Sequence, residues 1–373
     1  MRSINKYVLP SAVSLVTAMG VAVPAAQAFD FKASGQVDRA VTAVDNGHRS
    51  DIGFVDNTGS NTRFRFTGDQ VMDNGMKVGF DYEIAIGNNA SADWDVKNAG
   101  NEQNNFLDNR QANIYLEGNF GRFTLGKVDG AANATSEVDY SGLTYLGGGV
   151  DFADYAGGLS FWGKNGQVAA GNPKVGQVFN SFDALSRQNA IRYDSPTFSG
   201  VTLSASLDSG HAYELAARYA TDLARGGKFG VAADYVDSEN QKETFDPNNS
   251  LYINGDRFRE MGGSASLLLP SGIVFTVSGK HRQFVHSRQN SANNFFGGIG
   301  YVSGDNHFQV NYDRTDGAYI DGSKGNQYGL AYRRDWTKSI QMYASYHLYT
   351  ASGLGQGVKD INQIYTGVRL KFM

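Results

Sequence analysis

The side chains best suited to do chemistry in this 373-residue sequence are charged ones. A glycine-rich stretch, residues 128–186, contains acidic residues, and arginines recur before and after it. If that stretch faces the arginines across a narrow gap, the opposed charges create a field between them. Water dipoles and charged or zwitterionic solutes align in such a field, whereas apolar solutes must disturb the ordered water. The acidic candidates are Glu137, Asp139, Asp151 and Asp154, and the basic candidates are Arg63, Arg65, Arg110, Arg187 and Arg192.

The parity of neighbouring residues predicts where these arginines point. Arg63 and Arg65 alternate with Phe64 and Phe66, so they belong to the polar face of a strand. Arg192 has the same kind of position later in the chain. Together with Arg110, these arginines lie on strands that we expect to run in one direction, so the four could form one basic patch.

Two other arginines are less regular. If Arg110 lies on the polar face, Asn113 falls on the apolar face of the same strand. Arg187 has apolar parity near a strand end and could instead hold the stretch 128–186 in place. The alternative for all of these charges is that they only solvate a wide interior and external loops.

No enzyme-like constellation accompanies the charged residues. The chain has no cysteine, which excludes disulfides, thiolate metal sites and a cysteine nucleophile. Its six histidines are scattered without metal-ligand spacing, and it has neither a Gly-x-Ser-x-Gly elbow nor a phosphate-binding loop. We therefore expect no catalytic residue, no metal and no cofactor.

The elements that position these charges are strands with one apolar and one polar face. In Met76–Ile86, six apolar side chains fall on one parity, and Lys77, Asp81 and Glu83 fall on the other. The same alternation returns many times before Phe372. A soluble β-sandwich also alternates, but it does not place charges on the enclosed face of strand after strand. A closed sheet that is apolar outside and polar inside is a transmembrane antiparallel β-barrel, which suggests a pore.

The connections alternate between short turns and mostly long polar stretches. Seven short turns imply eight hairpins and hence about sixteen strands, with both termini on the short-turn, periplasmic side. The short turns are at 73–75, 118–121, 196–200, 224–227, 270–272, 304–306 and 335–339, and the long stretches are 45–61, 87–107, 128–186, 237–257, 286–294, 315–325 and 350–361.

The first residues predict a targeting segment. Arg2 and Lys6 precede a mostly apolar run, and Ala26-Gln27-Ala28 is a small-x-small cleavage site. We expect a signal peptide over 1–28 and a barrel domain over 29–373. The net charge of −4 does not favour a nucleic-acid partner, and we expect none.

Several segments, taken in their order and spacing, resemble the general bacterial porin family. They are Ser34-Gly35-Gln36-Val37-Asp38-Arg39-Ala40-Val41, the block Asn109–Gly121, Leu125-Gly126-Lys127, Ile191–Pro196 followed by Phe198-Ser199-Gly200, and Tyr365–Phe372.

The resemblance implies a homotrimer of sixteen-stranded barrels in the outer membrane of a Gram-negative bacterium, each with its third loop folded into the lumen. It also implies that the wall arginines of the family's constriction correspond to Arg63, Arg110 and either Arg192 or Arg187. The loop carboxylates of the family correspond to Glu137 and Asp139.

Two residues depart from the family's pattern. Met373 follows Phe372, the residue through which the barrel-assembly machinery is expected to recognise the chain. Arg39 falls on the apolar parity of the first strand, which either a trimer contact or a bulge would explain.

We expect a general diffusion porin that passes small hydrophilic solutes and ions, sits among outer-membrane lipids and uses no energy. A sugar- or anion-specific channel is the alternative, because Tyr343, Tyr349 and Tyr365 share lumen parity and could form an aromatic slide. A surface adhesin or structural barrel is a further alternative. The loop 87–107, with Trp94, is a candidate latch onto a neighbouring copy.

Overall fold

The computed structural model describes residues 29–98, 106–239, 257–285 and 291–373. The predicted signal peptide, residues 1–28, lies outside the described residues. Nowhere in these ranges is there a helix with the length and apolar character needed to cross a membrane.

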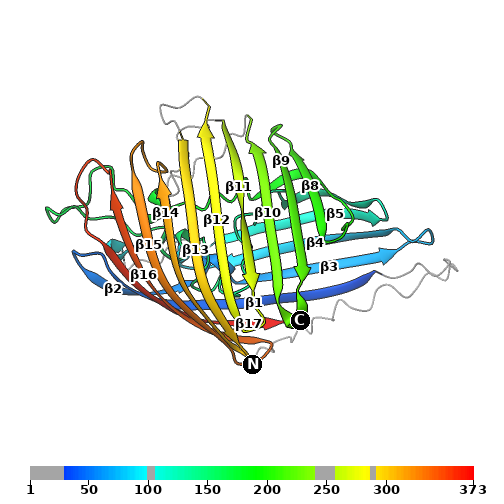
Figure 1. The fold of residues 1–373 in the computed structure, drawn as a ribbon, viewed down its shortest axis with the longest axis horizontal. Helices are drawn as coiled ribbons and strands as arrows, with labels where there is room; N and C mark the ends of the chain where they lie inside the picture. The colour runs from blue at the N-terminus through cyan, green and yellow to red at the C-terminus, as the bar shows by residue number, and fades with distance from the viewer. Residues whose placement is uncertain (1–28, 99–105, 240–256, 286–290) are drawn as a thin grey trace, which may run out of the picture.

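The described chain is almost entirely β-structure (Figure 1). The strands are β1 (Asp30–Asp45), β2 (Ser50–Asp56), β3 (Arg63–Val71), β4 (Lys77–Gly87), β5 (Phe106–Gly118), β6 (Gly121–Asp129), β7 (Arg187–Asp194), β8 (Val201–Asp208), β9 (Tyr213–Asp222), β10 (Lys228–Asp237), β11 (Phe258–Leu268), β12 (Ile273–Phe284), β13 (Ser291–Ser303), β14 (Asn306–Asp316), β15 (Lys324–Asp335), β16 (Ile340–Ser352) and β17 (Ile361–Phe372). The short helices are η1 (Thr58–Ser60), η2 (Val96–Asn98), α1 (Ala153–Ala156), α2 (Val175–Val178) and η3 (Ala224–Gly226).

The sheet closes on itself. Each strand pairs antiparallel with its neighbours, and β17 returns to β1 with a register from Gly35↔Phe372 to Asp45↔Asn362. Both β2 and β3 pair with β1, so they are the two halves of one interrupted barrel strand. Counted this way, the described residues form a closed barrel of sixteen strands, which confirms the predicted fold class. Closure leaves no unpaired edge, as a barrel in lipid requires.

One predicted loop is wrong. The stretch 45–61 was expected to be a single long connection, yet β2 occupies its middle, and the connection from β1 spans only residues 46–49. The glycine and aspartates of β2 concealed a strand whose outward residues are Ile52 and Phe54. The barrel strand is then interrupted over residues 57–62, where Asn57 caps η1 by accepting a hydrogen bond from the amide of Gly59.

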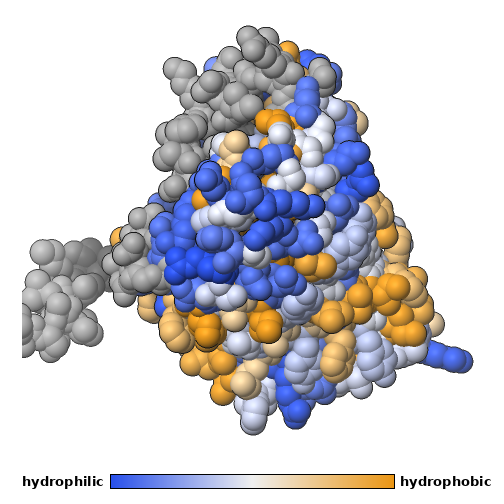
Figure 2. Space-filling view, turned by 90° about the vertical axis from the view of Figure 1, so that its left-hand side faces the viewer, coloured by the Kyte–Doolittle hydropathy of each residue, from blue (hydrophilic) through white to orange (hydrophobic). Residues whose placement is uncertain are grey.

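The two faces of the wall separate apolar from polar residues. In β12, Ile273, Phe275 and Val277 are exposed on the outside, while Thr276 and Ser278 point inward. Exposed apolar side chains form the belt that a bilayer covers. Figure 2 shows hydrophilic side chains gathered over one end of the molecule, with hydrophobic patches on the flank below them.

The predicted rhythm of connections is present. Each of the seven predicted short turns joins two consecutive strands. The pairs Asp30↔Asp69 and Gly35↔Phe372 place the start of β1 and the end of β17 on the short-turn side of the barrel. In outer-membrane barrels that side faces the periplasm, so the long connections lie on the extracellular side.

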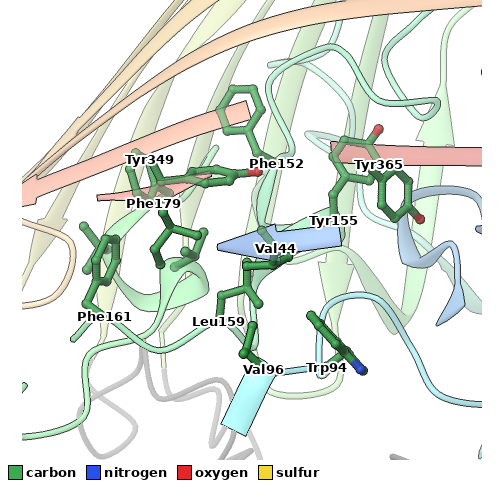
Figure 3. Packing of buried hydrophobic residues seen from close by; sticks show 14 of the residues in the cluster. Val44, Trp94, Val96, Phe152, Tyr155, Leu159, Phe161, Phe179, Tyr349 and Tyr365 are labelled. Carbon is green, nitrogen blue, oxygen red and sulfur yellow. The ribbon is translucent and has the colours of Figure 1, made fainter. Parts of the chain in front are cut away.

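Loop 3, residues 130–186 between β6 and β7, folds into the lumen. Its Phe152, Tyr155 and Phe179 are fully buried against Tyr349 and Tyr365 of the inner wall (Figure 3). Fully burying a large apolar side chain stabilises by about 1.5–3 kcal/mol, so the apolar residues of loop 3 account for its inward position.

Candidate functional site

Between loop 3 and the opposite wall lies a polar cavity of about 860 Å³. Loop 3 contributes four carboxylates to its lining, those of Glu137, Asp151, Asp154 and Asp183. Four arginines also line the cavity, namely Arg63, Arg110, Arg187 and Arg282. The structure thus brings together three predicted acids and three predicted arginines, and adds Asp183 and Arg282.

Two of the wall arginines share one acid. The Arg110 Nε donates to Glu83 Oε1 at 2.6 Å, and an Arg63 terminal nitrogen donates to the same oxygen at 3.3 Å. Glu83 projects inward from β4, which pairs with β3, the second half of the interrupted barrel strand. Two guanidinium groups on one carboxylate leave an excess positive charge on this wall.

A β-bulge resolves the irregular parity of Arg110. Glu83 pairs with Gln111, but the next residue, Ile84, pairs with Asn109, so Arg110 is the extra residue. Arg110 can therefore point inward while Asn113, buried in the wall, also points inward and donates to the Lys127 carbonyl at 3.0 Å. Arg187 reaches the cavity from the start of β7, where its Nε lies 3.0 Å from Asp129 Oδ1.

The four carboxylates of loop 3 face the cavity, and none of them forms an ion pair within the part of the chain that the structure describes. Burial, together with Asp151, raises the pKa of Asp154 to about 7 and that of Asp183 to about 8. Burial and the neighbouring Asp151 and Asp183 raise the pKa of Glu137 as well. Crowded carboxylates resist ionisation, so this face carries a charge that varies near neutral pH.

Three predicted site residues lie outside the cavity lining. Arg192 donates to the backbone carbonyls of Asp129 and Gly130, both at 3.0 Å, and so secures the start of loop 3. Asp139 accepts from Thr276 Oγ1 at 2.8 Å and Gln309 Nε2 at 3.0 Å, which fastens loop 3 to β12 and β14.

Arg65 is the third. It is half-exposed and binds Asp81 through both ends of its guanidinium group. It lies two residues beyond Arg63 along β3, about 7 Å nearer the periplasmic rim.

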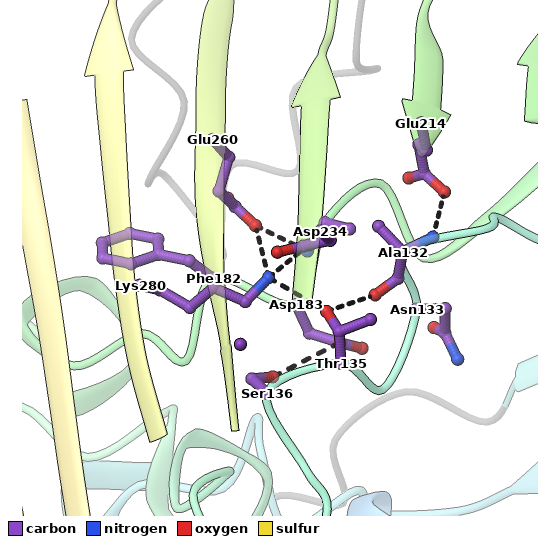
Figure 4. Close-up of polar contacts among 12 residues, drawn as sticks. Ala132, Asn133, Thr135, Ser136, Phe182, Asp183, Glu214, Asp234, Glu260 and Lys280 are labelled. Atoms are coloured by element: carbon purple, nitrogen blue, oxygen red, sulfur yellow. Dashed lines mark hydrogen bonds and ion pairs between the residues drawn. The ribbon is translucent and has the colours of Figure 1, made fainter. Parts of the chain in front are cut away.

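A buried charge network holds loop 3 against β10, β11 and β12 (Figure 4). Lys280 Nζ donates to Glu260 Oε1 and to Thr135 Oγ1 of loop 3, each at 3.2 Å, and also contacts Asp234. The side chains of Lys280, Glu260 and Asp234 are fully buried. Glu260 also binds Arg282 and accepts from the amide of Ala184 at 3.1 Å.

Glu214 adds a related contact on β9. Its carboxylate accepts from the amides of Ala132 and Leu185, at 2.9 and 3.0 Å. It therefore ties both ends of loop 3 to one wall residue, and Figure 4 shows it beside Ala132.

Sequence reasoning missed the interrupted segment 57–62 as part of the lining. Thr58, Gly59, Ser60 and Asn61 line the cavity. Gln36 Nε2 holds this segment by donating to the carbonyls of Ser60 and Asn61, at 2.8 and 2.9 Å. The run of five turn-forming residues from Asn57 was the available signal, but it fell inside a stretch that was taken for an external loop.

Two aromatic predictions are wrong. Tyr343, Tyr349 and Tyr365 point inward but are covered by loop 3, with exposed fractions of 2, 0 and 0%, so no solute can slide along them. Trp94 is also buried in the chain's own interior, where its indole packs on Gly53. Trp94 itself cannot contact a neighbour, and the role predicted for the loop 87–107 stays a prediction, because residues 99–105 lie outside the described residues.

The family model described as Gram-negative porin matches residues 12–354. The chain belongs to this family. It is an outer-membrane channel for passive diffusion, as the family and the closed barrel around a polar lumen show. Family and fold point to a channel rather than an enzyme.

Solved porins share this fold. The anion-selective porin from Comamonas acidovorans is 19% identical with a TM-score of 0.61, covering 92% of this chain and 100% of that one. OmpT of Vibrio cholerae in its trimer form is 11% identical with a TM-score of 0.58, covering 92 and 100%. Salmonella typhi OmpF in complex with daunomycin is 13% identical with a TM-score of 0.56, covering 92 and 97%. No curated protein matches the sequence.

Proposed function

We propose that solutes cross this porin through the gap between the loop 3 carboxylates and the wall arginines. The carboxylates of Glu137, Asp151, Asp154 and Asp183 form one side, and Arg63, Arg110 and Arg187 form the other. The observation that carries the proposal is that both sets line one 860 Å³ cavity. A field across a narrow, wet passage orders water and orients charged solutes, so the constriction admits small hydrophilic solutes.

The balance of charge favours a mild cation preference once the loop 3 acids are ionised, at pH values above the raised pKa values of Asp154 and Asp183. The four loop acids have no ion-pair partner among the described residues, whereas each wall arginine shares or holds a carboxylate. Fixed negative charge concentrates cations in a pore.

Single-channel recording in planar bilayers tests the constriction. Arg63→Ala removes a positive charge and side-chain volume, so conductance should rise and the reversal potential in a salt gradient should shift toward cations. Glu83 keeps Arg110 as its partner in this variant, so the wall should still fold. Arg65→Ala is the matched control, because Arg65 lies outside the cavity lining. Equal reversal potentials for the wild type and both variants would contradict the proposal.

A general diffusion pore is preferred over a sugar- or anion-specific one, because the tyrosines that suggested a slide are buried. The same recordings separate the hypotheses. A large ohmic conductance in simple salt supports diffusion, a small conductance blocked by a sugar or a specific anion supports specificity, and no conductance supports the adhesin or structural alternative.

We also propose that three copies assemble. The porin OmpT, which shares the fold, is described in a trimer form. On the outer wall Arg39 lies 3.6 Å from Asp56, beside Phe54, which is 70% exposed. Asp56 is buried, so the exposed charge on this face is the Arg39 guanidinium, and a charged group facing lipid is costly; this face therefore suits a protein neighbour. Cross-linking in mild detergent that traps only monomers would contradict a trimer.

Processing and assembly complete the proposal. Removal of residues 1–28 would leave Phe29 at the amino terminus, which sequencing of the membrane-extracted protein tests. Phe372 faces outward at the end of β17 and would be available to the barrel-assembly machinery. Phe372→Ala should lower the amount of folded protein in the outer membrane.

A further inference from the structure

An apolar groove of about 590 Å³ crosses the outer wall over β13 to β16. One side is a row of aromatic residues, Tyr301, Phe308 and Tyr332, which are paired across neighbouring strands. The other side is a row paired in the same way and formed by Ile299, Val310, Leu330 and Tyr346. The groove therefore runs across the strands. At β16 the next residue of the aromatic row is Ala344, which pairs with Tyr332. The alanine side chain is too small to close the groove at this point.

A cation lies just beyond the aromatic row. Arg334 follows Tyr332 by two residues on β15, so it shares the outward face, and it is exposed. Its guanidinium carbon is 5.8 Å from the ring centroid of Trp336, which is 65% exposed at the periplasmic turn. Lys338 is exposed in the same turn. Neither cation has an ion-pair partner in the described ranges.

Three arginines on the outward faces of strands differ from Arg334. Arg39 pairs with Asp56, Arg259 with Asp237 at 3.2 Å, and Arg314 with Asp316 at 2.9 Å. Arg259 and Arg314 lie toward the extracellular end of their strands. The chain thus neutralises its own outward arginines on that side and leaves Arg334 available to an external anion on the periplasmic side.

We propose that this surface binds an anionic phospholipid of the periplasmic leaflet. One acyl chain lies in the groove, and the phosphate accepts hydrogen bonds from Arg334. The chemistry fits at both ends. The groove presents almost only apolar atoms, while a long arginine side chain and an interfacial tryptophan are suited to the headgroup level of a bilayer. Retention of such a lipid does not depend on which solutes cross the lumen.

Native mass spectrometry of the purified full-length protein in mild detergent, titrated with dioleoylphosphatidylglycerol, tests the proposal. Arg334→Gln should weaken binding about fivefold, the effect of one cation at a membrane surface. Arg314→Gln is the matched control and should change nothing, since that arginine is already paired. Ala344→Leu fills the groove without changing charge, so it should also weaken binding.

Dioleoylglycerol, which lacks the phosphate, separates the headgroup from the chains: it should bind weakly, and equally to the wild type and to Arg334→Gln. Unchanged phosphatidylglycerol affinity in both Arg334→Gln and Ala344→Leu would overturn the proposal. Equal losses in Arg334→Gln and Arg314→Gln would also overturn it, because they would indicate unspecific attraction. Protection of Ala344→Cys from thiol labelling in a lipid-free assembly, lost in monomers, would show instead that a second copy covers the groove.

Discussion

Loop 3 is held to the barrel wall on two flanks by different physics. Against β16, β17 and β1 it is held by apolar packing, in which Phe152, Tyr155 and Phe179 are buried (Figure 3). Against β10 to β12 it is held by charges that are buried just as completely, with Lys280 between two carboxylates (Figure 4). The lumen of this porin therefore contains both a small protein core and a buried salt-bridge network.

The two flanks should respond differently to mutation. When an apolar side chain is truncated, the stability lost depends on the atoms removed and on the cavity that the surroundings leave unfilled. When one member of a buried ion network is removed, the stability lost is larger than its contacts suggest, because the remaining charge is left uncompensated away from water. The charged flank should therefore be the more fragile of the two, although both are equally buried.

The largest expected effect is that of Lys280→Met. The substitution keeps the side-chain volume but leaves Asp234 and Glu260 without their shared cation, at a cost of about 3–5 kcal/mol. Thr135 also loses its donor, so loop 3 should detach on this flank. We expect the single-channel conductance to be larger and noisier than that of the wild type. On a gel, the band of the compact, folded protein should disappear at a lower heating temperature than for the wild type.

A charge-balanced variant tests the cause. Lys280→Met combined with Asp234→Asn removes the uncompensated charge, because Glu260 still binds Arg282, and it should recover part of the lost stability. If this double variant is no better than Lys280→Met alone, packing rather than charge determines the strength of this flank.

The second effect, smaller than the first, is that of Phe179→Ala on the apolar flank. The ring of Phe179 is fully buried and packs edge-on against Tyr349 with centroids 5.7 Å apart. Its truncation should cost about 3 kcal/mol, at the low end for a buried phenylalanine because a loop can partly collapse. Thermal stability should fall while conductance stays nearly unchanged. A conductance change as large as that of Lys280→Met would show that both flanks position the constriction equally.

The barrel was predictable because its strands obey a period of two. Arg63 and Arg65 could be assigned to the inner face from Phe64 and Phe66 alone. The same rule failed where the backbone departs from it. The bulge at Arg110 adds a residue, and the break at 57–62 inserts a turn into a strand.

Within loop 3 there is no period to use. Asp139 and Asp151 are the same residue type in the same glycine-rich stretch, yet one binds the wall and the other faces the cavity. Lys280 was visible on the polar face of β12, but only the fold shows that Asp234, Glu260 and Thr135 converge on it. Long-range convergence of this kind is not encoded in local spacing.

Asp139 and Asp151 give the third prediction, which compares an anchored acid with a free one. Asp139→Asn leaves poorer acceptors for Thr276 and Gln309, so it should lower stability by about 1–3 kcal/mol and barely alter selectivity. Asp151→Asn should move the reversal potential toward anions without a stability loss. The two variants have the same change in charge, so each is the other's control. Selectivity that shifts equally in both would mean that total charge, rather than position, sets the preference.

The smallest effect comes from two loop 3 carboxylates that have no ion pair among the described residues, those of Asp154 and Asp183, and it requires no mutation. Burial and the neighbouring Asp151 raise the pKa of Asp154 to about 7 and of Asp183 to about 8, so both bind protons as the pH falls from 9 to 6. Each proton bound removes a negative charge from the loop side of the constriction, while the wall arginines stay charged throughout. Cation preference should therefore decline as the pH falls, and it should be restored when the pH is raised again. Reversal potentials measured at intervals across this range test the sign.

The double variant Asp154→Asn and Asp183→Asn is the control. Its reversal potential should not change with pH and should stay at the less cation-selective value that the wild type has at pH 6. A wild-type preference for cations that grows with acidification, or a double variant as pH-dependent as the wild type, would show that other groups determine the charge of the passage.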